Sequence, residues 1–255
     1  MTTPNLIQKA AALIRDSQNI TVLTGAGVSR ESGIPTFRDA LDGLWARFNP
    51  QELATASAFM ANPKLVWDFY EYRRDIMRDK SPNAGHFALA ELQRRYPSLV
   101  VITQNIDELH EQGGSTGVIH LHGRIAGNKC FYNCQGDPTM VDVSLLSWDK
   151  ENGPPACPHC GRWVRPDVVW FGEMLPPAAL NAAAEALQVS ELMLVIGTSG
   201  LVMPAADMPM VIKRRGGKAI EINPDDTPIS DIADIKLSGP SGEILPRIVE
   251  ALDEA

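Results

Sequence analysis

Five short apolar runs, rich in β-branched residues, restrict the folds open to this 255-residue chain. They cover residues 20–24, 99–103, 118–121, 192–196 and 219–222, and helical patterns separate them. Strands that are apolar on both faces and alternate with helices are typical of a parallel sheet that helices cover on both sides. We therefore predict an α/β protein with a doubly wound parallel sheet.

A small or polar motif follows each predicted strand. These motifs are Gly25-Ala26-Gly27, Gln104-Asn105-Ile106-Asp107, His122-Gly123, Gly197-Thr198-Ser199 and Asn223-Pro224-Asp225. In doubly wound sheets, ligands bind in the crevice beyond the carboxyl ends of the strands. The five loops therefore predict one shared ligand site.

Two segments, 35–95 and 127–166, interrupt the alternation of strands and helices. The first is rich in helices and loops, and the second contains four cysteines and several prolines. We interpret both as parts of a smaller inserted domain, so that residues 1–34, 96–126 and 167–255 form the main domain. Helical spacing of apolar residues predicts helices at 3–15, 63–80, 83–95 and 244–252.

Charge and hydropathy exclude two classes of partner. The net charge of −8 argues against a nucleic-acid surface, because binding to duplex DNA needs clustered Lys and Arg to displace counterions. No apolar run approaches the length of about 20 residues that a membrane helix requires. The first five residues also lack the charged head and apolar core of a signal peptide. We therefore expect a cytoplasmic protein that binds neither nucleic acid nor membrane.

All four cysteines of the chain fall in one short segment. Cys130-x3-Cys134 and Cys157-x2-Cys160 are separated by 22 residues, a spacing that lets two turns bring four thiolates into one tetrahedron. A site of four sulfurs leaves no position open for a substrate. We therefore predict one structural Zn²⁺ ion, held by these four cysteines, that supports folding and not catalysis.

The first glycine-rich turn, residues 24–33, permits close backbone approach to a phosphate. It departs from the common dinucleotide fingerprint because Arg30 stands where the last glycine is expected. Ile34-Pro35-Thr36-Phe37-Arg38-Asp39 follows it, and residues 103–110 and His120-Leu121-His122-Gly123 come later. With this ordered set the sequence resembles the sirtuin family of NAD-dependent protein deacylases, from about Leu23 to Pro246. The resemblance implies a Rossmann-like domain joined to a small domain made of a zinc ribbon and helices.

The resemblance also implies a role for each residue of the matched motifs. His122 corresponds to the catalytic base. The residues implied to bind NAD are Gly25, Ala26, Phe37, Arg38, Gln104, Asn105, Asp107, Gly197, Thr198, Ser199, Asn223 and Ser241. Those implied to contact the substrate peptide by strand addition are Val169, Phe171 and Gly172.

The chemistry that the resemblance implies requires a base. NAD is consumed as a co-substrate, nicotinamide departs, and a ribose hydroxyl must lose a proton before it attacks the acyl carbon, which ends as O-acyl-ADP-ribose. Histidine suits this step because its pKa lies near neutral pH. Of the five histidines, His86 and His110 have the pattern of structural residues. His120 and His122 are two apart and are predicted to share one face of a strand, and only His122 precedes the glycine of the family motif.

Three further residues match sirtuins of class III, which remove succinyl, malonyl or glutaryl groups. They are Ala54, Tyr70 and Arg73. Tyr70 and Arg73 lie three apart, on one face of a predicted helix. A guanidinium and a phenol can hold an acidic acyl chain, whereas Ala54 leaves room for it. The competing interpretation is that Arg73 faces solvent beside Arg74.

Other functions remain compatible with the same residues. An ADP-ribosyltransferase could use the same NAD site, and a regulatory module could sense NAD without catalysis. A dehydrogenase fits less well because the glycine-rich turn departs from its fingerprint. Acyl-lysine proteins or peptides are the expected partners, whereas the sequence does not indicate the particular target proteins or the oligomeric state.

Overall fold

The computed structural model describes residues 3–36 and 49–254, which form two compact units. Unit 1 comprises residues 1–36, 81–121 and 177–255, and unit 2 comprises residues 37–80 and 122–176. In the described part of the chain, no helix is long and apolar enough to span a membrane.

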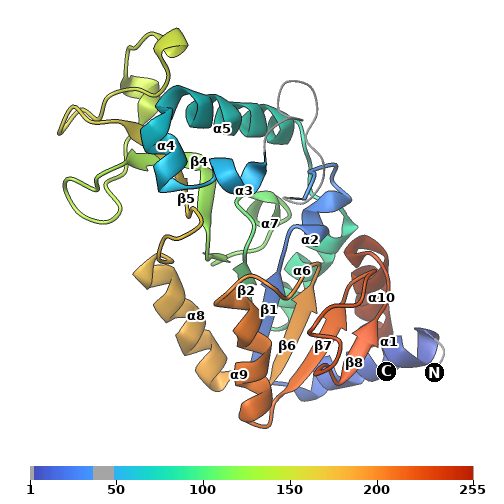
Figure 1. Cartoon of the computed structure of the whole chain (residues 1–255). Coiled ribbons are helices and arrows are strands. Elements are labelled where there is room, and N and C mark those ends of the chain that lie inside the picture. Colours follow the sequence, from blue (N-terminus) through green and yellow to red (C-terminus); the bar gives the residue numbers. More distant parts are fainter. Residues whose placement is uncertain (1–2, 37–48, 255) are drawn as a thin grey trace. The chain divides into compact units, whose positions relative to one another are not determined.

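Unit 1 is built on a parallel sheet of six strands in the order β3-β2-β1-β6-β7-β8 (Figure 1). The strands are β1 (Ile20–Thr24), β2 (Val100–Thr103), β3 (Ile119–His120), β6 (Leu192–Ile196), β7 (Lys218–Ile222) and β8 (Ile235–Leu237). Every residue of β1 and β6 is buried, as expected for central strands covered on both faces. The predicted doubly wound α/β fold and its five strands are therefore confirmed. The edge strand β8 was not predicted, because three residues give too short a pattern.

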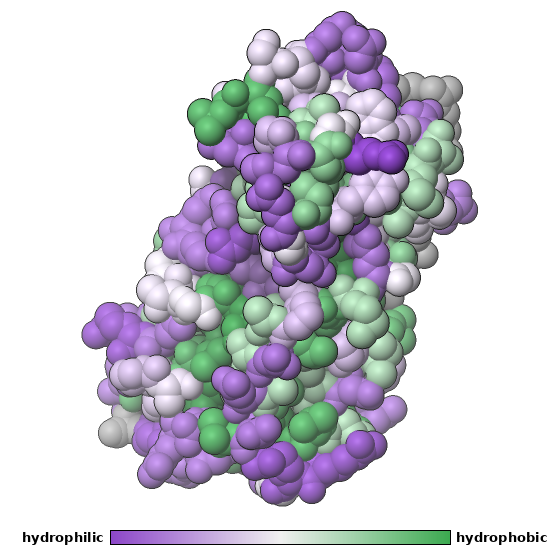
Figure 2. All heavy atoms as spheres, turned by 90° about the vertical axis from the view of Figure 1, so that its left-hand side faces the viewer, coloured by the Kyte–Doolittle hydropathy of each residue, from purple (hydrophilic) through white to green (hydrophobic). Residues whose placement is uncertain are grey.

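Helices cover both faces of the sheet. They are α1 (Thr3–Asp16), α2 (Gly27–Arg30), α6 (Ala84–Arg95), α7 (Leu109–Gln112), α8 (Pro177–Val189), the 3₁₀ helix η4 (Ala205–Asp207), α9 (Met208–Arg214) and α10 (Ser241–Asp253). α1, α6 and α10 pack together against one face and share a continuous apolar core with it, whereas α8 and α9 lie on the other side (Figure 1). Figure 2 views the molecule from the side on which α8 and α9 lie and shows apolar and polar residues mixed over this surface.

The units divide the chain differently from the predicted domains at α6, and also at residues 122–126 and 167–176, which the prediction placed in the main domain but which belong to unit 2. The prediction placed residues 83–95 in the small domain, yet α6 belongs to unit 1. Its buried Leu89 and Leu92 join the core formed with α1 and α10. A helix that buries its apolar face in this core is stabilised there, whatever its neighbours in the sequence.

Unit 2 combines short helices with an antiparallel strand pair. Its elements are α3 (Pro50–Leu53), α4 (Ala56–Ala61), α5 (Pro63–Arg78), β4 (Gly123–Cys130), the 3₁₀ helices η2 (Val143–Leu145) and η3 (Lys150–Asn152), and β5 (Val164–Val168). Asn62 caps α5 by accepting a hydrogen bond from the amide of Leu65, and Pro63 opens the helix. Phe59 packs on Phe131 and Trp170, with ring centroids 5.2 and 5.3 Å apart, and ties α4 to the strand pair.

The turns after β1 and β6 approach each other too closely for side chains. The Gly27 amide donates to the Gly197 carbonyl at 2.8 Å, and a Cβ on Gly27 would lie 2.7 Å from the Gly197 backbone. Gly197 itself has φ +59°, and its Cβ would lie 2.6 Å from the Val28 nitrogen. Glycine at these positions therefore fixes the distance between the two central turns.

We expect Gly197→Ala to lower the free energy of unfolding by about 2–4 kcal/mol, from backbone strain together with the clash at Val28. The matched control is Gly216→Ala, since Gly216 also has a positive φ (+85°) but its Cβ would meet no atom within 4 Å. That variant loses only the backbone contribution, about 1–2 kcal/mol. Urea unfolding of both variants measures the difference, and equal losses would contradict the close-approach argument.

Candidate functional site

The loops at the carboxyl ends of the unit 1 strands are joined by side-chain hydrogen bonds. Gln104, after β2, donates to the Thr198 hydroxyl at 2.9 Å. Asn223, after β7, donates to the Thr198 carbonyl at 2.8 Å. Three of the residues predicted to bind NAD therefore meet at Thr198, and Gly25 lies against the same residue, since its Cβ would be 2.8 Å from Thr198.

A second group of contacts lies at the end of β2. The Ser29 hydroxyl donates to Asp107 Oδ2 at 3.0 Å and accepts from the Asn105 side-chain amide at 3.0 Å. Burial raises the pKa of the Asp107 carboxyl, and the hydrogen bonds from Leu109 and Ser29 act in the opposite direction. Asn105 and Asp107, two of the three predicted polar residues of this loop, are thus brought together, with their side chains held by one hydroxyl.

Ser29 is a site residue that the sequence analysis missed. It lies on the one-turn helix α2 and is buried. Its position inside the glycine-rich turn was the only available signal. A serine hydroxyl is both donor and acceptor, and this is what allows it to connect an amide and a carboxylate.

Of the remaining residues predicted to bind the cofactor, the structure describes Ser241, Ala26 and Ser199. Ser241, at the start of α10, is buried and donates to Glu31 Oε1 at 2.9 Å. Glu31, which the sequence analysis did not single out, also accepts from the Gly242 amide. Ala26 and Ser199 lie in the turns after β1 and β6. Phe37 and Arg38 lie outside the described residues.

Two histidines of unit 1 form a buried neutral pair. The rings of His86 on α6 and His110 on α7 have centroids 5.0 Å apart. Burial lowers the pKa of His86 to about 4 and, with the nearby His86, that of His110 to about 3. His110 Nε2 lies 2.9 Å from the Thr24 hydroxyl, which donates to Thr103 Oγ1. These contacts agree with the predicted structural role of both residues.

His122 belongs to unit 2 and occupies a turn. The prediction that His120 and His122 share a strand face is wrong, since β3 ends at His120 and residues 121–122 turn away. Gly123 produces this turn with φ +74°, and a Cβ there would lie 2.2 Å from the Asp167 carbonyl oxygen. The His122 carbonyl accepts from the Val169 amide at 2.9 Å. Position 123 therefore requires glycine, because any side chain there would clash with the Asp167 backbone.

The residues predicted to read the acyl group lie close together in unit 2. Tyr70 and Arg73 on α5 and Ala54 after α3 are all buried. The Tyr70 hydroxyl accepts from Trp170 Nε1 at 2.9 Å. Burial raises the pKa of Tyr70 to about 12, while the Arg73 charge opposes this shift. The phenol therefore keeps its proton at neutral pH and can donate it.

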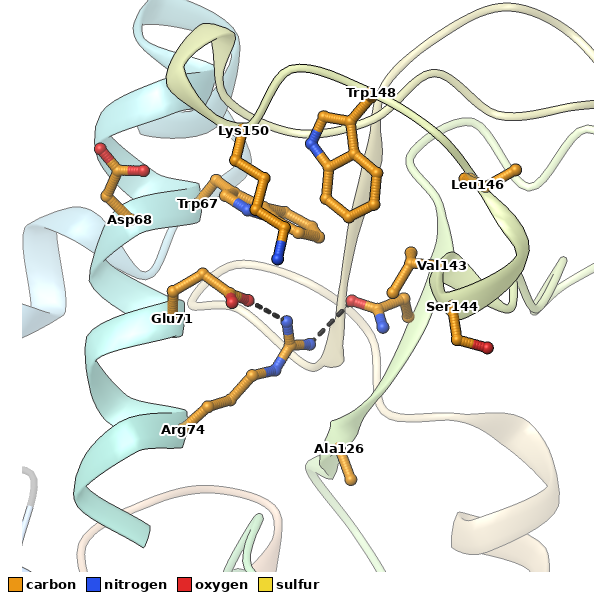
Figure 3. A pocket seen from close by; sticks show the side chains of 11 residues that line it. Trp67, Asp68, Glu71, Arg74, Ala126, Val143, Ser144, Leu146, Trp148 and Lys150 are labelled. Atoms are coloured by element: carbon orange, nitrogen blue, oxygen red, sulfur yellow. Dashed lines mark hydrogen bonds and ion pairs between the residues drawn. The ribbon is translucent and has the colours of Figure 1, made fainter. Parts of the chain in front are cut away.

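The burial of Arg73 argues against a solvent-facing role. Its exposed fraction is 9 %, and its guanidinium carbon lies 5.9 Å from the centre of the Phe69 ring. The adjacent Arg74 points elsewhere, into a pocket of about 480 Å³ between α5 and the segment 143–150 (Figure 3). There it donates to Asn128 Oδ1 at 2.7 Å and pairs with Glu71 (Figure 3). Arg74 thus has hydrogen-bond and ion-pair partners within unit 2.

The predicted peptide-binding edge follows β5. The Phe171 amide donates to the Ala54 carbonyl at 2.9 Å, and Phe171 forms a parallel bridge with Thr55. The Phe171 side chain is exposed, whereas Trp170 beside it is buried. Gly172 has φ +84° with open space around it. The edge therefore places the exposed Phe171 ring next to Ala54, one of the residues predicted to contact the acyl group.

The four cysteines form a compact cluster. Cys130 Sγ lies 3.6 Å from Cys160 Sγ, and Cys134 Sγ lies 3.9 Å from Cys157 Sγ, with all four sulfurs within 4.8 Å of one another. A zinc ion bonded to four sulfurs at about 2.3 Å sets them about 3.8 Å apart. Three residues separate the first cysteine pair and two separate the second, and Asn133, within the first pair, has a positive φ of +47°. The cysteines are therefore placed to bind one zinc ion, as predicted.

Comparison with known proteins agrees with this fold and these sites. The Sir2 family model matches residues 25–204. The chain is 45% identical to an NAD-dependent protein deacylase of Pyrococcus abyssi over 96% of this chain and 97% of the relative, and 44% identical to one of Ralstonia nicotianae over 94% and 95%. A Sir2 homologue in complex with NAD superimposes with a TM-score of 0.87 at 44% identity, covering 97% of this chain and 94% of the other.

The protein is thus an α/β protein with a doubly wound sheet and a four-cysteine metal module. It belongs to the Sir2 family, and the predicted identification as a sirtuin is confirmed. A Sir2 variant in complex with a deacetylated p53 peptide and 3′-O-acetyl ADP ribose is also similar, at 34% identity and a TM-score of 0.82, covering 96% of this chain and 97% of the other.

We expect Cys130→Ser and Cys157→Ser to lose the metal and to lower the free energy of unfolding of unit 2 by about 5 kcal/mol or more. Both cysteines are buried in an apolar cluster with Trp67 and Val164, so the loss of the metal also loosens this core. Atomic absorption gives the zinc content, and Trp fluorescence follows unfolding. Retention of one zinc per chain by either variant would contradict the assignment.

Proposed function

We propose that this protein is an NAD-dependent protein-lysine deacylase that removes acetyl groups and also succinyl or malonyl groups, with release of nicotinamide and O-acyl-ADP-ribose. The observation that carries the proposal is the likeness, over 97% of the chain, to a Sir2 homologue bound to NAD. The joined loops around Thr198, Asn105 and Asp107 support it, since they cluster polar groups at the carboxyl edge of the sheet.

Each unit has a separate part in this proposal. Most of the NAD-binding residues lie in unit 1: Gly25 and Ala26, with Phe37 and Arg38 from the first residues of unit 2, contact the diphosphate and the nicotinamide ribose. Gln104, Asn105 and Asp107 line the nicotinamide pocket, whereas Gly197, Thr198, Ser199, Asn223 and Ser241 hold the adenosine half. Unit 2 supplies His122, the acyl-reading residues and the edge Val169, Phe171 and Gly172, which adds the acyl-lysine peptide as a strand.

His122 acts as the general base that takes a proton from a ribose hydroxyl. Loss of nicotinamide precedes this step and does not need the base, because the acyl oxygen itself attacks the anomeric carbon. The two events can therefore be separated by experiment.

We expect His122→Ala to slow O-acyl-ADP-ribose formation by about 10²–10⁴-fold, the usual contribution of a positioned base. Exchange of labelled nicotinamide into NAD, which reports the earlier step, persists in the variant. Chromatography of the products measures both rates. Unaltered product formation would refute the role of His122, and transfer of label from NAD to protein without any acyl requirement would favour an ADP-ribosyltransferase.

The acyl preference follows from the chemistry of Tyr70 and Arg73. Arg73 supplies a cation of low exposure, and Tyr70 keeps its hydroxyl proton because burial raises its pKa, while Trp170 Nε1 donates to its oxygen. Burying a carboxylate without a partner is costly, so an acidic acyl group needs both contacts. A charge-assisted hydrogen bond contributes about 1.5–3 kcal/mol, equivalent to a preference on the order of tenfold to hundredfold.

We expect Arg73→Met to reduce desuccinylation, expressed as kcat/KM, by about tenfold to hundredfold, while deacetylation changes much less. Arg78→Met is the matched control, because Arg78 lies on the same helix and its side chain is 70% exposed. Mass spectrometry of acetyl- and succinyl-lysine peptides measures both activities. Equal losses of the two activities in Arg73→Met would remove the case for an acidic-acyl pocket.

A further inference from the structure

His120 has hydrogen-bond partners at both ring nitrogens. It is the last residue of β3, and its side chain is only 5% exposed. Nδ1 lies 3.2 Å from the backbone carbonyl oxygen of Asn105, and Nε2 lies 2.7 Å from Glu111 Oε1 on α7. The ring therefore bridges the loop after β2 and the helix that follows this loop.

Both partners are acceptors. A carbonyl oxygen can only accept, so Nδ1 must carry a proton, and an ionised carboxylate likewise requires a proton on Nε2. An imidazole with protons on both nitrogens is the positively charged form, which the Glu111 carboxylate neutralises at short range. The geometry is therefore that of an imidazolium–carboxylate pair.

The ionisable groups around His120 are few. α7 contributes Glu111 and the neutral His110, and the loop after β2 contributes Asp107, whose carboxylate attracts the His120 charge. β2 has no ionisable side chain, and on α8, which packs on β3, the only one is the exposed Glu185. Among the described residues on these elements, the charges nearest to His120 are thus negative.

The loop that His120 holds is the one proposed to line the nicotinamide pocket. The Asn105 carbonyl is bonded to His120, while its side-chain amide donates to Ser29, which in turn bonds Asp107. We propose that His120, as an imidazolium paired with Glu111, is a positioning residue that fixes Asn105 and Asp107 for NAD. This inference rests on the proposed NAD site of unit 1 and extends it to two residues that do not themselves contact the co-substrate.

The protonation state can be measured directly. Long-range ¹H–¹⁵N spectra of the full-length zinc-loaded protein, with ¹⁵N-labelled histidine, are expected to show two protonated nitrogens on His120 at neutral pH. Glu111→Gln is expected to convert the signal to that of a neutral ring. Observation of one protonated nitrogen in the unsubstituted protein would overturn the proposal.

Binding tests the positioning role. We expect Glu111→Gln to raise the Kd for NAD about tenfold, as befits loss of a charge-assisted hydrogen bond, and to raise KM for NAD more than it lowers kcat. Glu185→Gln makes the same change of charge at an exposed site on α8 and is expected to leave Kd unchanged. An unchanged Kd in Glu111→Gln would overturn the proposal.

Exchanging the two residues of the pair tests the positioning of Asn105 separately from the stability of the fold. The double variant Glu111→His with His120→Glu restores an ion pair between α7 and β3, but an ionised carboxylate at position 120 cannot donate to the Asn105 carbonyl. The proposal predicts that the thermal midpoint recovers towards that of the unsubstituted protein while Kd for NAD stays high. Recovery of both would show a purely structural role and overturn the proposal.

The inference and the proposed function can fail separately. Kd for NAD is measured by calorimetry without turnover, so the binding experiment does not depend on deacylation. Absence of deacylation together with Glu111-dependent NAD binding would refute the proposed activity and leave this inference standing.

Discussion

The close contact between the turns after β1 and β6 is the constraint on which the site of unit 1 depends. The backbones of Gly27 and Gly197 are in direct contact. This contact fixes the positions of Ser29, in the turn after β1, and Thr198, in the turn after β6. Ser29 then holds Asn105 and Asp107, and Thr198 holds Gln104 and Asn223. Polar groups from four strand ends are thus fixed by contacts that leave no room for a Cβ at the centre.

Charge is distributed in this site according to burial and to the neighbouring groups. The rings of His86 and His110 lie against each other and remain neutral, with pKa values lowered by burial. His120 differs because Glu111 lies against its ring. Three buried histidines within one unit therefore differ in the side chains that contact their rings.

In unit 2, helix α5 contacts both the four-cysteine cluster and the residues proposed to read the acyl group. Trp67 of α5 packs with Cys130 and Cys157, whereas Tyr70 and Arg73 of the same helix lie in a different buried environment with Trp170 and Phe69. Loss of zinc is therefore expected to disturb, through α5, the residues proposed to read the acyl group.

The sequence by itself determined the parallel sheet, the long helices and the cysteine cluster, because apolar periodicity and ligand spacing are local patterns. It also indicated Tyr70 and Arg73 through the resemblance to class III sirtuins, and their three-residue spacing places both on one helical face. The short strand β8, the bridging role of Ser29 and the turn that separates His122 from His120 were decided only by tertiary structure. Each depends on contacts between residues far apart in the chain, as with Ser29 and Asp107 or Gly123 and Asp167, and no local pattern records such distances.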